Sequence, residues 1–145
     1  MACITGISLA LLVGGFARWV GLDRDRAFYP TVMIVIASLY VLFAAIGGPS
    51  AILTEGLAGL GFIGLAVAGF RRSPWLVVIA LVGHGIFDLV HPHVIANPGV
   101  PVWWPEFCSA YDIVAGVLLG ALLIRAKPRR TWRKTAAPAP SLPAK

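Results

Sequence analysis

The sequence predicts an all-α integral membrane protein: a five-helix bundle with its N-terminus outside and its C-terminus in the cytoplasm. Of the 145 residues, 59% are hydrophobic and 12% are charged, whereas about 25% of the residues in a soluble domain carry a charge. The apolar residues form five long stretches, and the basic residues gather at alternate connections between them. This composition excludes an ordinary soluble domain.

Each apolar stretch is long enough to cross a bilayer as a helix. A hydrocarbon core of about 30 Å requires about 20 helical residues, and a backbone in lipid must satisfy its own hydrogen bonds, which excludes open strands. Helix-start residues punctuate the stretches, such as Ser73 and Pro74 before the fourth. The predicted spans are 2–20, 28–47, 50–70, 74–91 and 105–124.

The positive-inside rule sets the predicted orientation. The second and fourth connections contain no Lys or Arg, so the other connections and the C-terminal end are expected in the cytoplasm. The chain then divides into a transmembrane domain, 1–125, and a basic tail rich in Pro and Ala, 126–145, which is expected to be disordered. Basic residues occur at Arg18, Arg24, Arg26, Arg71, Arg72 and from Arg125 onward.

The formal net charge of +6 is interpreted as a membrane signal rather than a nucleic-acid signal. The basic residues lie at the ends of apolar segments, not along one face of a polar domain. We therefore expect contact with anionic lipid and no nucleic-acid partner. Cys3 and Cys108 have no metal-site or disulfide spacing and are predicted to be isolated apolar thiols, although a bridge between the first and fifth spans stays open.

Ionisable residues form one stripe on the fourth span. His84, Asp88 and His91 are spaced i, i+4 and i+7, which places them within a sector of about 60° on a helix. At about 1.5 Å per residue, Glu55 and Asp112 on neighbouring spans lie at a similar depth, roughly 6 to 12 Å from the outer ends of the helices. Three spans therefore place ionisable groups in the outer half of the bundle.

Burial of these groups predicts a shared polar pocket. An acid in hydrocarbon costs at least a few kcal/mol unless it is neutral, paired or facing water, and no Lys or Arg lies on that side. A divalent metal such as zinc, iron or manganese would neutralise the acids. The predicted metal ligands are His84, Asp88 and His91, and the predicted catalytic residues are Asp112, which could instead complete the ligand set, and Glu55, as a further ligand or its partner.

The leading hypothesis is a metal-dependent hydrolase that acts on a lipid-like substrate in the bilayer. Two alternatives stay open: a small transporter or accessory subunit that binds protons or a cation, and a scaffold whose neutral acids and imidazoles only hold the helices together. The proline-rich segment before the fifth span is expected to be a lid or a rigid connector, with Asn97 as a turn residue.

Residues 83–120 contain a tract of four short motifs. It comprises His84-Gly-x-x-Asp88-x-x-His91, then Asn97-Pro-Gly-Val-Pro, then Trp103-Trp-Pro-x-Phe-Cys108, then Tyr111-Asp112. This tract resembles one of small uncharacterised bacterial multi-pass membrane proteins, which implies a location in the bacterial inner membrane and supplies no activity. A more distant similarity is to intramembrane zinc hydrolases of the alkaline ceramidase type, which have seven helices and a spaced histidine pair that this chain lacks.

The charge distribution makes a direct prediction about topology. A reporter fused after Lys145 that works only in the cytoplasm should be active, because the basic residues around the C-terminal end are retained on that side. The same fusion to a reporter that works only in the periplasm should be silent. Activity of the periplasmic reporter alone would invert the predicted orientation.

Overall fold

The computed structural model describes residues 1–126 and confirms the all-helical prediction. Five helices, each long and apolar enough to span a membrane, account for most of this part of the chain, which contains no strand. The prediction of a disordered tail falls on residues beyond 126 and lies outside the described residues. The elements are α1 (Ala2–Val20), the short 3-10 helix η1 (Leu22–Arg24), α2 (Phe28–Gly47), the short 3-10 helix η2 (Pro49–Ala51), α3 (Ile52–Arg71), α4 (Trp75–Val94) and α5 (Trp104–Arg125).

The fourth helix is longer than predicted at its outer end. We expected it to stop at His91, but it continues through Pro92 to Val94. A proline removes one backbone donor, and within the last turn this costs a single bond, while the amide of Ile95 still donates to the carbonyl of His91 at 2.9 Å. The extension keeps His91 on the same helix face as the residues before it.

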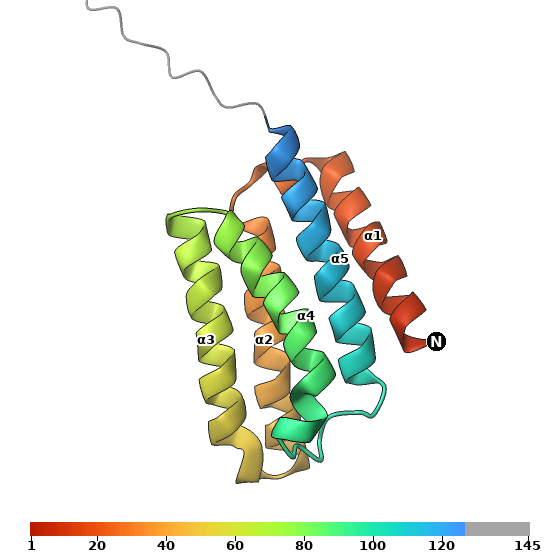
Figure 1. Ribbon diagram of the computed structural model, residues 1–145, viewed down its shortest axis with the longest axis vertical. Coiled ribbons are helices and arrows are strands. Elements are labelled where there is room, and N and C mark those ends of the chain that lie inside the picture. The colour runs from red at the N-terminus through yellow and green to blue at the C-terminus, as the bar shows by residue number, and fades with distance from the viewer. Residues whose placement is uncertain (127–145) are drawn as a thin grey trace, which may run out of the picture.

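Successive helices run in opposite directions and form a bundle (Figure 1). The helix α5 packs between α4 and α1, while α2 packs against α3, and α4 contacts both α2 and α3. The first helix therefore lies along the last one, although the two are far apart in sequence (Figure 1). Residues of the central helix α4 are thus surrounded by three other helices.

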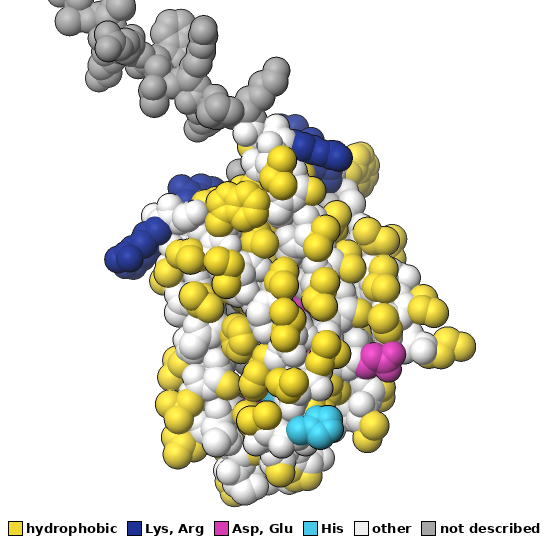
Figure 2. All heavy atoms as spheres, viewed as in Figure 1, with side chains coloured by type: hydrophobic (Ala, Val, Ile, Leu, Met, Phe, Trp, Pro, Cys, Tyr) yellow, Lys and Arg dark blue, Asp and Glu magenta, His cyan; other side chains and the backbone are white. Residues whose placement is uncertain are grey.

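The basic side chains of the described residues gather at one end of the bundle. Because the helices alternate in direction, the first and third connections and the end of α5 meet there (Figure 1). Figure 2 shows Lys and Arg side chains at this end, and acidic and histidine side chains nearer the opposite end. We call these the basic end and the outer end. The described basic residues are Arg18, Arg24, Arg26, Arg71, Arg72 and Arg125.

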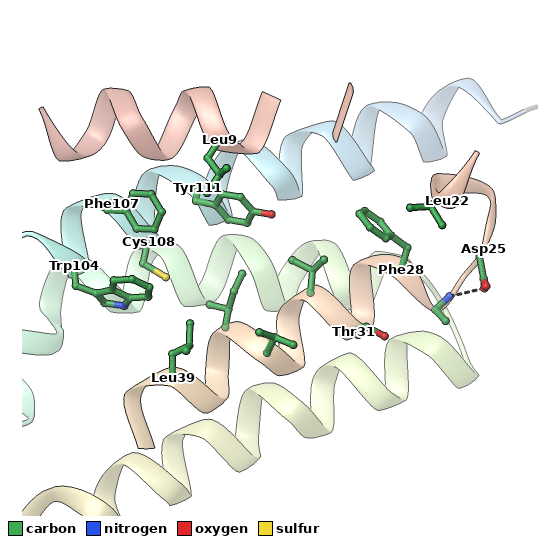
Figure 3. Close-up of a pocket in the computed structure, with 14 residues that line it drawn as sticks. Leu9, Leu22, Asp25, Phe28, Thr31, Leu39, Trp104, Phe107, Cys108 and Tyr111 are labelled. Atoms are coloured by element: carbon green, nitrogen blue, oxygen red, sulfur yellow. Dashed lines mark hydrogen bonds between the residues drawn. The ribbon is translucent and has the colours of Figure 1, made fainter. Parts of the chain in front are cut away.

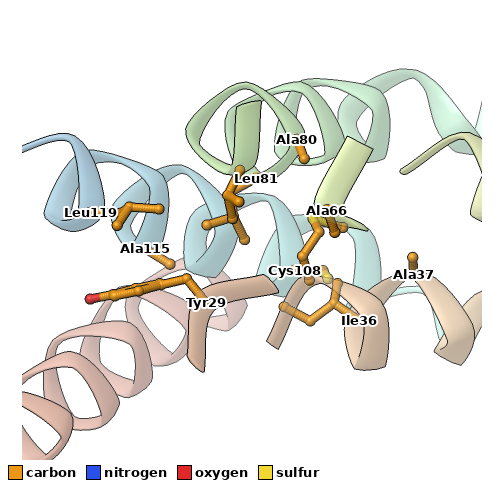
Figure 4. Packing of buried hydrophobic residues seen from close by; sticks show 11 residues of the cluster. Tyr29, Ile36, Ala37, Ala66, Ala80, Leu81, Cys108, Ala115 and Leu119 are labelled. Carbon is orange, nitrogen blue, oxygen red and sulfur yellow. The ribbon is translucent and has the colours of Figure 1, made fainter. Parts of the chain in front are cut away.

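A dry core of mostly small side chains fills the half of the bundle towards the basic end. Met33 and Leu81 are fully buried there, and alanines from α2, α3, α4 and α5 surround them (Figure 4). Small residues let membrane helices approach closely. Along α4 and α5 this core begins one helical turn from the predicted site, since Leu81 precedes His84 by three residues and Ala115 follows Asp112 by three.

A glycine sets the closest approach of α4 to α5. A Cβ atom on Gly85 would lie 2.9 Å from the carbonyl oxygen of Ser109, 2.9 Å from Cγ1 of Ile113 and 3.3 Å from Cβ of Asp112. Real Cβ atoms do not approach backbone so closely. Gly85 therefore allows the helices to meet beside the ionisable residues.

Replacing Gly85 by alanine should destabilise the fold, because the added methyl group would push α5 away from α4. Overpacking of this kind costs roughly 1–3 kcal/mol. Gly83→Ala is the matched control, since its Cβ would meet only the Phe62 ring at 3.9 Å, and alanine favours a helix over glycine by about 0.8–1 kcal/mol. Reversible unfolding in detergent measures both variants, and equal stability of the two would contradict this account of the helix contact.

Candidate metal centre

Four buried side chains from α4 and α5 converge in the outer half of the bundle. They are His84 and Asp88 on α4 and Cys108 and Asp112 on α5, and one potential ligand atom from each lies within 4.8 Å of all the others. Each helix contributes a pair spaced i, i+4, which places both members on one face. We call these four residues the inner cluster.

Hydrogen bonds link the inner cluster to a third helix. The Nδ1 atom of His84 lies 2.7 Å from Oδ2 of Asp112 and 3.4 Å from Oδ2 of Asp88. The thiol of Cys108 donates to Oδ2 of Asp112 at 3.8 Å. From α2, the hydroxyl of Tyr40 donates to Oδ1 of Asp88 at 2.7 Å. The positions of these side chains are therefore fixed by α2, α4 and α5 together.

A second polar group lies nearer the outer end of the bundle. Nε2 of His91 is 2.8 Å from Oε1 of Glu55, and the amide of Asn97 donates to the same oxygen at 2.7 Å and to the carbonyl of Tyr40 at 3.2 Å. Asn97 also accepts from the amide of Gly99, so it serves as the predicted turn residue as well. We call Glu55, His91 and Asn97 the outer group.

Tyr40 lies between the two groups. Its ring centroid is 4.3 Å from that of His91, while its hydroxyl bonds Asp88 in the inner cluster. All five of the acids and imidazoles in the two groups are buried, with 2% or less of their surface exposed. Ionisable groups from α3, α4 and α5 therefore share one enclosed region, as the burial argument predicts.

The charges in this region do not balance without an additional cation or proton. It contains three carboxylates, Glu55, Asp88 and Asp112, and two imidazoles. Even with both imidazoles protonated, one negative charge is left over. Within residues 1–126, the only arginine in an ion pair is Arg18, which pairs with Asp23 at the basic end.

Two buried carboxylate oxygens in the inner cluster have no hydrogen-bond partner among the described residues. They are Oδ1 of Asp112 and Oδ2 of Asp88, which has only the longer 3.4 Å contact with Nδ1 of His84, and both side chains are 0% exposed. An unsatisfied buried acceptor costs about 1–3 kcal/mol, and more when it is charged. A cation bound between α4 and α5 would contact these oxygens and neutralise them, so the donor set fits a divalent metal.

The structure unites part of the predicted ligand set and adds a residue to it. His84, Asp88 and Asp112 lie together as expected, whereas His91 and Glu55 form a separate pair. Cys108, which we predicted to be an isolated apolar thiol, belongs to the inner cluster. The sequence could have indicated this, because Cys108 precedes Asp112 by four residues and therefore shares a helix face with it.

Three other observations refine the sequence predictions. Cys3 and Cys108 are both free, so the bridge between α1 and α5 is not formed. Glu106 is exposed in the first turn of α5, away from the cluster. Tyr40 was not predicted as part of the site, because its place there depends on how α2 packs against α4.

The segment between α4 and α5 covers the outer group. A cavity of about 260 Å³ lies beneath it and is bordered by His91, Asn97 and Pro101. The segment is held against α2 at Gly99, where a Cβ atom would clash with the carbonyl oxygen of Phe43. Two members of the outer group, His91 and Asn97, therefore border a small cavity beside this segment.

Comparisons of this chain with protein-family models, with curated proteins and with solved structures found no match. The resemblance of residues 83–120 to a tract of bacterial membrane proteins stays a prediction.

The Tyr40 hydroxyl should stabilise the fold measurably. Tyr40→Phe removes the donor to Oδ1 of Asp88, and leaving a buried acceptor unpaired should cost about 1–3 kcal/mol. Tyr111→Phe is the control, because the structure gives its hydroxyl no hydrogen bond to the inner cluster. Unfolding of both variants in the same detergent tests the difference, and an equal loss of stability would contradict the proposed role of Tyr40.

Proposed function

We propose that this chain is an integral membrane metalloenzyme of the bacterial inner membrane that hydrolyses a lipid-like substrate. The metal ligands are His84, Asp88 and Asp112, with Cys108 as a fourth donor. One observation carries this proposal: two unpartnered, fully buried carboxylate oxygens lie beside an imidazole and a thiol.

Charge balance supports a divalent metal in the inner cluster. Two carboxylates, Asp88 and Asp112, neutralise a divalent cation when His84 is neutral. A thiol that binds a metal gives up its proton, so the extra negative charge of a Cys108 thiolate is offset when that proton is held by a carboxylate of the inner cluster. Glu55 and a protonated His91 then neutralise each other in the outer group, where they are 2.8 Å apart. Every ionisable group in the region is thereby compensated, and His91 acts as the partner of Glu55 rather than as a metal ligand.

The donor types favour zinc or iron over manganese. Imidazole suits both zinc and iron, and thiolate is a soft donor that selects them over the harder cations, which prefer oxygen. A set of four donors drawn from nitrogen, oxygen and sulfur also matches the usual coordination number of zinc. The presence of Cys108 therefore narrows the three metals predicted from sequence.

Glu55 is the best candidate for the catalytic base. A bound divalent metal would supply Lewis acidity for hydrolysis. Glu55 lies outside the inner cluster, so its carboxylate is free to hold a proton. His91 and Asn97 fix its orientation and border the 260 Å³ cavity at the outer end. Asp112, the other predicted base, is better placed as a metal ligand.

The surroundings of the inner cluster favour an apolar substrate and disfavour transport. Cys108 also borders a large apolar cavity between α1, α2 and α5, which gives the site a route from the lipid. Towards the basic end the fully buried Met33 and Leu81 belong to a dry core. A pathway for ions or protons across the membrane would need polar groups in the half of the bundle towards the basic end. The arrangement therefore supports a site confined to the outer half rather than a pathway.

Metal content tests the proposal and its ligand set. Protein purified without chelator and supplied with zinc, iron or manganese should hold about one metal ion per chain. The near-isosteric variants Asp88→Asn and Asp112→Asn, together with His84→Ala, should lose it. His91→Ala should retain the metal, because this residue lies outside the inner cluster, and the exposed His93→Ala is the control.

Elemental analysis of detergent-purified protein gives the result, and circular dichroism confirms that each variant is folded. Wild-type protein without stoichiometric metal would overturn the metalloenzyme proposal and favour the scaffold alternative. Loss of metal in His91→Ala while the helices stay folded would overturn the ligand set.

A further inference from the structure

A long apolar groove runs beside the metal centre. Its volume is about 600 Å³, within the range of about 300–1,000 Å³ that is typical of small-molecule sites. Figure 3 shows its walls, which come from α1, α2 and α5. Each of these helices is long and apolar enough to span a membrane. The lining includes Leu9, Phe28, Val32, Ile36, Leu39 and Phe107.

Three residues that carry a polar atom border this groove along one face of α5. Trp104, Cys108 and Tyr111 are spaced i, i+4 and i+7, and all three border it (Figure 3). The indole Nε1 of Trp104 is buried and has no hydrogen-bond partner among the described residues. Cys108 belongs to the inner cluster as well, so this side of the groove adjoins the proposed metal.

The length of the groove fits one lipid chain. Along α2 it extends from Leu39 to Ala27, which is about 18 Å at 1.5 Å per residue. An extended acyl chain can therefore lie along the groove with its polar end at one end of it.

We propose that this groove binds one acyl chain of an ester lipid, with the ester carbonyl at Trp104 and Cys108 and the chain end towards Phe28. The inference rests on the proposed function, since it names the substrate class of the metal centre. The unpartnered Trp104 N–H needs an acceptor, and an ester carbonyl supplies one.

This orientation places the scissile bond beside the inner cluster. Hydrolysis would consume one water molecule: its oxygen forms a bond to the acyl carbon, and the bond from that carbon to the alkoxy oxygen breaks. One water hydrogen leaves on the alcohol, and the other leaves on the fatty acid. No oxidant or further reactant is required.

Photolabelling in lipid nanodiscs tests the occupant and its orientation. Two phospholipid probes are used, one with a diazirine next to the acyl carbonyl and one with a diazirine at the chain end. The first should label residues 104–108, and the second should label residues 27–32. Leu9→Trp, which fills the groove, should reduce both labels about tenfold. Leu12→Trp is the control, since Leu12 is exposed on the same helix but does not line the groove.

Several outcomes would overturn the inference. These are a reversed labelling map, which would place the head group at the basic end, and labelling that Leu9→Trp leaves unchanged. Another is protection of the groove from both probes in a dimer seen by native mass spectrometry, which would mean that a second copy covers it. Metal content of the same samples separates the two proposals. If the protein binds metal but the groove is not labelled, only this inference is contradicted. If the groove is labelled but the protein binds no metal, only the proposed metal centre is contradicted.

Discussion

The burial of uncompensated carboxylates is the constraint on which the rest of this structure depends. Asp88 and Asp112 are completely buried in a bundle bounded by apolar helices, where an unpaired charge is expensive. The fold reduces this energetic cost through contacts close to the two acids. Gly85 lets α4 and α5 close around the acids, Tyr40 donates to one of them, and the dry core beyond Leu81 restricts the polar region to the outer half.

Two environments meet at the site from different directions. On the outer side, the covered cavity reaches His91 and Asn97, which orient Glu55. On the lipid side, the apolar groove reaches Cys108. Hydrolysis of a membrane lipid requires water and an apolar chain to reach the same bond, and this arrangement supplies a separate approach for each. Tyr40 connects the two, because its hydroxyl donates to Asp88 in the inner cluster and its ring contacts His91 in the outer group.

The sequence predicted the parts of this structure that depend on local composition. Span lengths follow from runs of apolar residues, and the stripe on α4 follows from helical periodicity. Tyr40 and Asn97 could not be assigned to the site from the sequence, because their contacts with the acids and imidazoles depend on how distant segments pack. His91 could have been separated from His84 by distance alone. Seven residues along a helix span about 10.5 Å, so the two imidazoles are attached almost two turns apart.

X-ray absorption spectroscopy of the metal-loaded protein tests the central claim most directly, because it reports the atoms around the metal. The account predicts nitrogen and oxygen ligands at about 2.0–2.2 Å and one sulfur at about 2.3 Å, with the sulfur signal lost in Cys108→Ser. A bound metal surrounded only by oxygen atoms, or a spectrum unchanged by Cys108→Ser, would contradict a metal centre between α4 and α5.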